Sequence, residues 1–405
     1  MAKYKVISGG VCAAKGFSAS GVHAGFRANP NKLDLAIIKA DVRCAAAGVY
    51  TTNKVYGAPI KVDRAHLVDG HAQAVLVNSG NANTCAANGV DLANECCALV
   101  AQQLGIAAED VLPASTGVIG QRINIECIEE HLSEIVLSDD ASEQANRAIM
   151  TTDTRTKTAA VEFTVGGKTC RIGGICKGSG MIHPNMGTML SFITTDCAIS
   201  HEMLTDALQE NVKKTYNRVT VDGDTSTNDM CVVLANGLAG NELIDWQNED
   251  YQAFCKALNE INTRLARQIA ADGEGATKLV TCTVKNSRSE ETAERLAKAV
   301  VGSNLVKAAM FGADANWGRV LCAMGYSKAP FRPEYVDVAF ESENGSVAVC
   351  EKGAALNFDE ELAKKVLTAN EVTIQIDVHE GEHAATAWGC DLTYDYVKIN
   401  GDYRT

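Results

Sequence analysis

The chain of 405 residues and 43.0 kDa is long enough for a large hydrophobic core and for two domains, because compact domains usually contain about 100–200 residues. Its formal net charge of −13 and pI of about 5.2 make nucleic acid and anionic membrane surfaces poor candidate partners, since the summed field repels phosphates. Hydrophobic residues at 46% and charged residues at 21% are typical of a globular protein and argue against disorder.

The amino-terminal stretch MAKYKVISGGVCAAKGF contains an apolar run that Gly9 and Gly10 interrupt and Lys15 ends. This run is too short for the core of a secretion signal, and no later stretch approaches the ~18 uncharged apolar residues of a membrane span. We therefore expect a cytoplasmic protein. The fifteen cysteines form no C-x-x-C pair and the eight histidines are scattered singly, so we expect reduced, mostly buried thiols and no metal site.

The first half of the chain contains one clear strand signal and one clear helix signal. AVLVN (74–78) is a short apolar run closed by the turn-forming residues SGNAN, which predicts a buried strand. SDDASEQANRAIM (138–150) opens with a serine that can cap a helix and with early acidic residues, so it predicts a helix.

The second half predicts two further helices. The stretch DYQAFCKALNEINTRLARQIA (250–270) has apolar residues three or four positions apart on one helical face, namely Phe254, Leu258, Ile261, Leu265 and Ile269. Ser287 and Glu290 have the spacing of a capping box ahead of ETAERLAKAVV, which predicts a helix that begins there.

Near the carboxyl end, apolar and polar residues alternate with the period of a half-buried strand, at Val372, Ile374, Ile376 and Val378. We expect this strand to turn at EGEH (380–383) toward an antiparallel partner within TAWGCDLTYDYVKI (386–399). The mixture of elements favours sheets covered by helices, while the order of the strands cannot be read from the sequence.

Two stretches resemble a phosphate-binding loop and a calcium loop but lack residues that those motifs require. GGKTCRIGG contains Gly167, Lys168 and Thr169, but a phosphate-binding loop needs a glycine at position 162, which is Glu162. In DGDTSTND (222–229), polar residues alternate as in a calcium loop, yet the sixth and twelfth positions are Thr227 and Val233 instead of glycine and glutamate. A polar turn is the better interpretation. No serine or cysteine with a partnered histidine and acid stands out.

The stretch KGSGMIHPNMGTMLSF (177–192) raises a chemical possibility at Gly187 and Thr188. A threonine hydroxyl is a weak nucleophile that needs a base beside it. If Thr188 became the first residue of a new chain, its α-amino group, with a reference pKa of about 7.7–8.0, could accept the hydroxyl proton. Gly187 offers a carbonyl with no Cβ to obstruct attack by Thr188. Cleavage there would leave fragments of 187 residues and of the remaining 218.

The same stretch closely resembles the processing site of the ornithine acetyltransferases, the glutamate N-acetyltransferase family of arginine biosynthesis. KGSGMIHPNMGTML departs from that family's pattern only by Gly187, where alanine usually stands. The resemblance extends along nearly the whole chain, in family order, through VNSGNANTC, PASTGVIG, TTDTRTK, VDGDTSTND, DGEGATKL, GADANWGRV and the last six residues, 400–405.

The resemblance implies a mixed α/β fold, an αββα four-layer sandwich with a smaller C-terminal α/β domain at about residues 280–400. It implies an α fragment of residues 1–187, which carries the oxyanion hole, and a β fragment of residues 188–405, which begins with the nucleophile. Two copies of each fragment would assemble. The resemblance includes no metal and no bound cofactor, and it leaves acetyl-CoA open as a second acetyl donor.

The resemblance also assigns roles to individual residues. Thr188 takes an acetyl group from N-acetylornithine and passes it to glutamate, while Thr116 and Gly117 correspond to the oxyanion pair. Further substrate contacts are expected from Thr154, Lys177, Thr188, Glu274, Asn400 and Thr405. Because each substrate carries a carboxylate and ornithine adds an ammonium, the pocket should combine a cation with an anion.

Two alternatives stay open. One is a related self-processed amidohydrolase or aminopeptidase, which would pass the acyl group to water, since a fold does not determine the acceptor. The other is an uncleaved binding protein in which GTML is a buried strand. A denaturing gel separates the second from the first, because only the cleaved forms give two bands.

Overall fold

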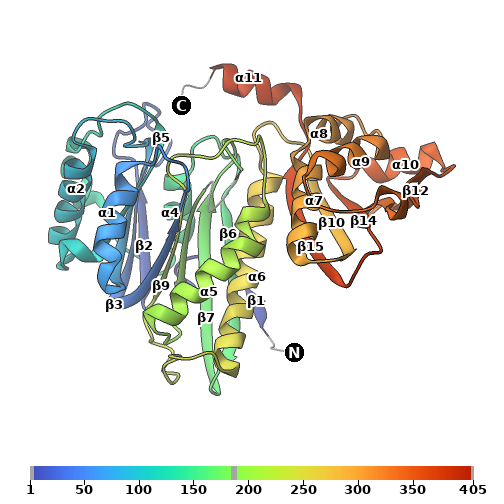
Figure 1. Cartoon of the computed structure of the whole chain (residues 1–405). Helices are drawn as coiled ribbons and strands as arrows, with labels where there is room; N and C mark the ends of the chain where they lie inside the picture. The colour runs from blue at the N-terminus through green and yellow to red at the C-terminus, as the bar shows by residue number, and fades with distance from the viewer. Residues whose placement is uncertain (1–3, 184–188, 403–405) are drawn as a thin grey trace.

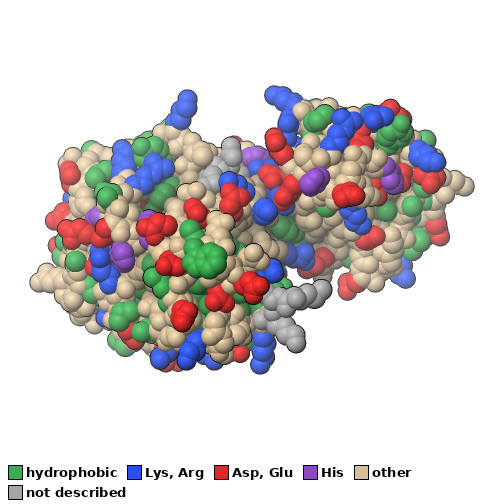
Figure 2. Space-filling view, turned by 60° about the horizontal axis from the view of Figure 1, so that its bottom comes forward, with side chains coloured by type: hydrophobic (Ala, Val, Ile, Leu, Met, Phe, Trp, Pro, Cys, Tyr) green, Lys and Arg blue, Asp and Glu red, His purple; other side chains and the backbone are tan. Residues whose placement is uncertain are grey.

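The computed structural model describes residues 4–183 and 189–402, so Gly187, Thr188 and Thr405 lie outside the described residues. Two bodies make up the molecule (Figure 1). The larger holds the strands and helices of the first two thirds of the chain, and helix α11 extends from the smaller body toward the larger one. On the face in Figure 2, acidic and basic side chains are mixed over both bodies.

Within the described ranges, nine strands form the sheet of the large body, in the order β1-β6-β7-β8-β9-β3-β4-β5 with β2 paired to β3. The long strand β3 joins the two halves: Leu35 to Ala40 pair with β2, and Ala45 to Tyr50 pair with β9. The pairing of β3 with β4 shifts in register between these segments, from Lys39 to Cys44, as at a β-bulge. The strands are β1 (Lys5–Ile7), β2 (Phe17–Val22), β3 (Leu35–Tyr50), β4 (His71–Asn81), β5 (Val111–Val118), β6 (Lys157–Val165), β7 (Lys168–Lys177), β8 (Leu190–Thr195) and β9 (Met230–Ala235).

Buried side chains show that the two halves stack between helices. Along β9, Val232 faces a core shared with Val77 of β4, whereas Val233 faces a second core shared with Leu208 and Leu265 of α5 and α6. A third core joins β4 to α1 and α2. The alternation follows from the two-residue period of strands and gives four layers, helix, sheet, sheet and helix. The helices are α1 (Ala58–His66), α2 (Gly89–Leu104), α3 (Glu126–His131), α4 (Ser142–Ile149), α5 (His201–Lys214) and α6 (Glu249–Ala271).

The smaller body has its own hydrophobic core between a six-stranded sheet and helices. Its strands are β10 (Leu279–Ser287), β11 (Asp337–Ser342), β12 (Gly345–Glu351), β13 (Ala354–Ala355), β14 (Glu371–Asp377) and β15 (His383–Cys390). Its helices are α7 (Glu290–Gly302), α8 (Asn304–Phe311), α9 (Trp317–Tyr326) and α10 (Glu360–Leu367), and α11 (Tyr394–Asp402) follows. The expected αββα sandwich with a smaller C-terminal α/β domain is confirmed, while the division into two cleavage fragments stays a prediction.

The predicted elements exist where the pattern was strongest. AVLVN lies in β4, the stretch 250–270 lies in α6, and three of the four alternating residues near the carboxyl end lie in β14, which Val378 directly follows. In α6 the five periodic apolar residues are all buried. Each of these signals rests on burial of one face, which tertiary packing preserves.

The predicted helix caps are wrong in detail. Helix α4 begins at Ser142 rather than near Ser138, because the Ser138 backbone pairs with Ala19 of β2 in an isolated bridge. Ser287 is the last residue of β10, and Ser289 is the cap of α7, accepting a hydrogen bond from Thr292 N–H at 3.1 Å. Capping spacing therefore predicts the helix but misplaces its first residue by two to four positions.

The predicted hairpin of β14 with the following strand is also wrong. Strand β10 lies between them, parallel to β14 and antiparallel to β15. Alternation specifies which face of a strand is buried and carries no information about its neighbour. In addition, the expected partner stretch 386–399 is only partly strand, since residues 394 onward form α11.

The fifteen cysteines all lie in the described ranges and are free thiols, most of them buried, as expected. None of the helices in those ranges combines the length and apolar character that a membrane crossing requires.

Candidate active site

A cavity of about 310 Å3 lies where several strand ends of the large body meet helix α11. It brings together five of the residues that the resemblance assigns, namely Thr116, Gly117, Lys177, Glu274 and Asn400. Thr154 lines a different cavity of about 340 Å3, between the end of α6 and α11. Thr188 and Thr405 lie outside the described residues.

Thr116 and Gly117 end strand β5 at an irregular pairing with β4. Gly80 pairs with Gly117, and Asn81 pairs with both Thr116 and Val118. Gly117 has φ +130°, and a Cβ there would lie 2.3 Å from the Gly80 carbonyl carbon. Only glycine permits this backbone, so the local geometry explains the glycine that follows Thr116.

Lys177, at the end of β7, is the cation of the cavity. Its side chain is nearly buried, and Nζ donates a hydrogen bond to Thr116 Oγ1 at 3.3 Å. Burial lowers the pKa of Lys177 below the ordinary lysine value. Lys177 and Thr116 also line a small adjoining hollow together with Met189, the residue after Thr188.

A buried ion network supports this corner from behind. Lys157 Nζ lies 2.6 Å from Asp153 and 2.5 Å from Asp272, and all three side chains are buried. Burial alone would raise the pKa of Asp153, but Lys157, Lys177 and the Gly178 N–H outweigh it and lower the pKa to about 2. Asp153 thus stays ionised and holds Gly178 N–H at 2.7 Å, next to Lys177.

Thr154 belongs to the same network. Its hydroxyl and its N–H both donate to the Asp272 carboxylate, the N–H at 3.1 Å. The structure therefore separates Thr154 from the other assigned residues and pairs its hydroxyl within the protein. Its expected contact with substrate stays a prediction.

Glu274 supplies a carboxylate to the cavity, which Asp222 and Asp224 also line. It is 7% exposed, and its Oε2 accepts a hydrogen bond from Asn400 Nδ2 of α11 at 2.7 Å. A Cβ on Gly180 would lie 2.2 Å from the Glu274 carboxyl carbon, so Gly180 leaves room for this carboxylate. The cavity therefore has a buried ammonium and a buried carboxylate, as a zwitterionic amino acid would require.

The segment DGDTSTND, which the sequence predicts to be only a polar turn, lines one side of the cavity. Asn228 Nδ2 donates to Ala82 O at 2.6 Å and to Ser115 O at 2.9 Å, and so joins this segment to the residue after β4 and to β5. In the described residues, no group of His, Cys, Asp or Glu has the arrangement of a metal site.

Sequence reasoning missed Asp222, Asn228 and Tyr396 as cavity residues. The Tyr396 hydroxyl donates to Asp222 Oδ2 at 3.3 Å, and burial and nearby carboxylates raise its pKa, so it stays protonated. The available signal was the dense polar pattern of 222–229, because polar side chains that return to buried backbone groups are typical of functional loops.

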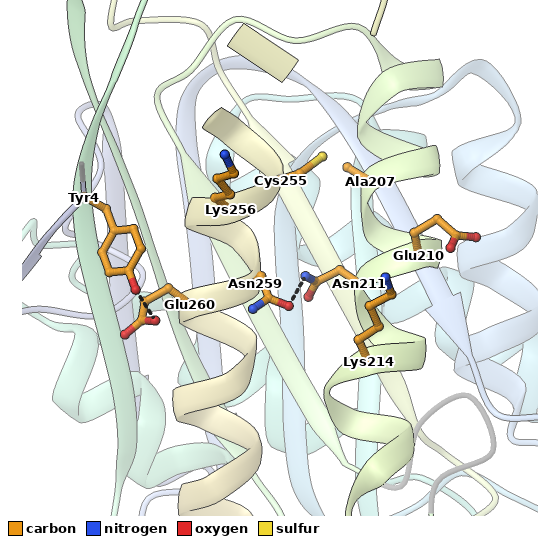
Figure 3. A pocket seen from close by; sticks show the side chains of 9 residues that line it. All are labelled: Tyr4, Ala207, Glu210, Asn211, Lys214, Cys255, Lys256, Asn259 and Glu260. Atoms are coloured by element: carbon orange, nitrogen blue, oxygen red, sulfur yellow. Dashed lines mark hydrogen bonds between the residues drawn. The ribbon is translucent and has the colours of Figure 1, made fainter. Parts of the chain in front are cut away.

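A second hollow, of about 380 Å3, lies between α5 and α6 on the outside of the large body (Figure 3). None of the assigned residues lines it. Tyr4 Oη donates to Glu260 at 2.8 Å, and Asn211 Nδ2 donates to Asn259 at 3.2 Å, as Figure 3 shows.

Comparison with known proteins identifies relatives of the whole chain. A family model described as "ArgJ family" matches residues 18–405. The chain is 50% identical over 393 residues to "Arginine biosynthesis bifunctional protein ArgJ 1" of Clostridium acetobutylicum, covering 96% of each protein. It is 50% identical over 403 residues to the ArgJ protein of Symbiobacterium thermophilum, covering 98% of this chain and 99% of that one.

A solved structure is also similar. The crystal structure of the argJ protein of Bacillus halodurans matches with a TM-score of 0.50 and 47% identity, and the match covers 53% of this chain and 100% of that one. The layered fold, the cavity and these matches define an acyltransferase of arginine biosynthesis. The chain belongs to the ArgJ family, the ornithine acetyltransferase and glutamate N-acetyltransferase family.

Proposed function

We propose that this protein cleaves itself between Gly187 and Thr188 and then transfers the acetyl group of N-acetylornithine to glutamate through an acetyl ester on Thr188. The observation that carries the proposal is the contact between Lys177 and Thr116 in a hollow that Met189 also lines. Met189 directly follows Thr188 in the sequence, and the resemblance gives Lys177 and Thr116 binding and oxyanion roles.

In the cleavage step, Thr188 Oγ bonds to the Gly187 carbonyl carbon as the C–N bond between the two residues breaks. The hydroxyl proton passes to the new α-amino group, and water hydrolyses the resulting ester to a Gly187 carboxylate and a free Thr188 hydroxyl. The match to the crystallised chain from Bacillus halodurans agrees with this step in length, because it covers 100% of that chain and 53% of this one. That share is close to the 218 of 405 residues expected for the second fragment.

In the transfer step, Thr188 Oγ attacks the acetyl carbon of N-acetylornithine while the Thr188 α-amino group accepts the hydroxyl proton. The amine of ornithine leaves with that proton, and the amine of glutamate then attacks the ester and restores the hydroxyl. Thr116 Oγ1 and Gly117 N–H would stabilise the oxyanion of each tetrahedral intermediate. Lys177 matches the substrate carboxylate, and Glu274 matches the ornithine ammonium.

Three finer features belong to the same proposal. The fragments assemble as two copies of each, no metal or bound cofactor takes part, and acetyl-CoA serves as a second donor for glutamate. The word "bifunctional" in the names of the relatives supports the last of these.

Intact-mass analysis of the purified protein with N-acetylornithine tests the proposal. We expect two masses, the second fragment gaining one acetyl group that added glutamate removes as N-acetylglutamate. Loss of the acetyl group to water at the same rate, with or without glutamate, would identify the related amidohydrolase instead. A single full-length mass in active protein would rule out both.

A further inference from the structure

We propose that Asp222 is a positioning residue for self-cleavage, which holds the backbone that leads toward the Gly187–Thr188 bond. The proposal rests on the proposed function, since it concerns the cleavage step. The proposal assigns a role to the segment DGDTSTND, whose alternating polar side chains do not match a calcium loop.

The Asp222 carboxylate binds two consecutive backbone N–H groups of the segment before the cleavage position. Oδ2 accepts from Met181 N at 2.6 Å, and Oδ1 accepts from Ile182 N at 2.8 Å. Met181 has φ +55°, a left-handed backbone that costs free energy for a residue with a side chain. Hydrogen bonds to an ionised acceptor are strong enough to hold such a conformation.

The neighbours of Asp222 extend this clamp to the next residues. Val221 N donates to Ile182 O at 2.7 Å, and Thr225 Oγ1 donates to His183 O at 2.8 Å. His183 Nδ1 lies 3.0 Å from Thr220 Oγ1. Residues 181–183 are therefore held one after another by residues 220–225.

The clamp itself is anchored to the smaller body. Lys307 of α8 is 3% exposed, and its Nζ donates to Val221 O at 2.6 Å and to Cys390 O at 2.8 Å. A buried ammonium satisfied by backbone carbonyls is costly to displace, so it fixes the residue next to Asp222.

On the other side of the cleavage position, Met230 N donates to Met189 O at 2.8 Å as β8 begins. The described residues on both sides of the cleavage position are thus hydrogen-bonded to the stretch 220–230. An internal attack gains its rate from such preorganisation, because small misplacements of the reacting atoms cost large factors. After cleavage, residues 181–183 are no longer joined to Thr188, so the clamp should matter for cleavage far more than for transfer.

The test measures both steps in the full-length chain. In Asp222→Asn, an amide nitrogen replaces one acceptor opposite a backbone donor. We expect the first-order cleavage rate, followed by denaturing gel after cell-free synthesis, to fall about tenfold or more. We expect kcat per cleaved chain to fall by a smaller factor, because residues 181–183 are no longer joined to Thr188 after cleavage. Thr225→Val, which removes only the bond to His183 O, should slow cleavage by a smaller factor.

Asp359→Asn is the matched control, because the Asp359 carboxylate also accepts hydrogen bonds from two backbone N–H groups, those of Glu361 and Leu362, but lies in the smaller body and does not line the cavity. It should cleave at the unchanged rate. Normal cleavage of Asp222→Asn with a raised KM would overturn the proposal and make Asp222 a substrate-binding residue. If the unchanged protein is never cleaved while active, the proposed function itself fails. If Asp222→Asn fails to fold, the Thr225→Val rate decides, and an unchanged rate there overturns the clamp.

Discussion

The groove between α5 and α6 and the cavity beneath α11 have similar volumes but differ in the residues that line them. The groove of Figure 3 is formed by side chains of α5, α6 and Tyr4, whereas the cavity beneath α11 draws on segments spread from Asn53 to Asn400. Size therefore does not distinguish an active site here. Convergence of distant segments and burial of charge do.

Several polar groups of the groove pair with other groups of the protein. Glu260 accepts from Tyr4 and from Arg264, and Glu210 pairs with Lys213. The Asn211 amide continues inward, accepting from Asn262 at 2.5 Å, and Asn262 accepts from Tyr216 at 3.0 Å. This series of hydrogen bonds holds α5 against α6, so the polar residues of the groove have a structural role.

The cavity instead presents charges at a cost to stability. Lys177 is nearly buried and bonded to a neutral hydroxyl, and Glu274 is bonded to a neutral amide. Buried charges of this kind are expensive unless a ligand completes them. The contrast predicts large effects of substitution in the cavity and small effects in the groove.

The largest effect is expected at Thr188. Thr188→Ala removes the attacking oxygen for both steps, so the protein should remain one chain and have no measurable transferase activity. A denaturing gel and an assay for N-acetylglutamate check this. Thr188→Ser keeps a hydroxyl and is the matched control, expected to be cleaved. Cleavage of Thr188→Ala would show that another group attacks.

Next comes the oxyanion residue. Thr116→Ala should fold but turn over about 10²–10³ times more slowly, as for loss of one oxyanion donor. The comparison is with Thr283→Ala in the smaller body, where the hydroxyl pairs with Thr386 at 3.1 Å far from the cavity. Thr283→Ala should leave kcat unchanged. Normal kcat in Thr116→Ala would remove Thr116 from the mechanism.

The charge of Lys177 should make kcat/KM depend on pH. Its ammonium is present below its pKa in the folded protein and is lost as the pH rises through it. Because burial lowers that pKa, kcat/KM should fall at a lower pH than an ordinary lysine would give. Lys177→Arg keeps the charge and should move this alkaline limb upward, while Lys177→Met should lower kcat/KM about ten- to a hundredfold at neutral pH. If kcat/KM of Lys177→Arg falls at the same alkaline pH as in the unchanged protein, another group causes that fall.

The smallest effect is expected in the groove. Lys256 is exposed there, and Lys256→Ala should change kcat/KM by less than about twofold and the free energy of unfolding by no more than about 0.5 kcal/mol. Steady-state kinetics and denaturant unfolding measure the two quantities. A large loss of activity would mean that the groove takes part in function, and the contrast between the hollows would fail.

The sequence predicts the features that depend on local patterns or on the family resemblance. Periodicity finds α6 and β14, and the resemblance finds the layers and the meeting of Thr116, Lys177 and Glu274. Neither reveals that β10 separates β14 from β15, since neighbours in a sheet depend on long-range packing.

The contacts of the remaining site residues could not be predicted from the sequence for the same reason. Asp222 looks like part of a turn until the fold places it against the Met181 backbone, and the pairing of the Thr154 hydroxyl with Asp272 cannot be read from the sequence. The cytoplasmic location and the assembly of two copies of each fragment stay predictions.

The central claim is that one backbone bond is severed so that a threonine hydroxyl gains its own amine as base. Amino-terminal sequencing of protein that is actively producing N-acetylglutamate tests it most directly. We predict two sequences in equal amounts, one from the start of the chain and one beginning Thr188-Met189-Leu190. A single sequence from the start of the chain, in fully active protein, would contradict the account.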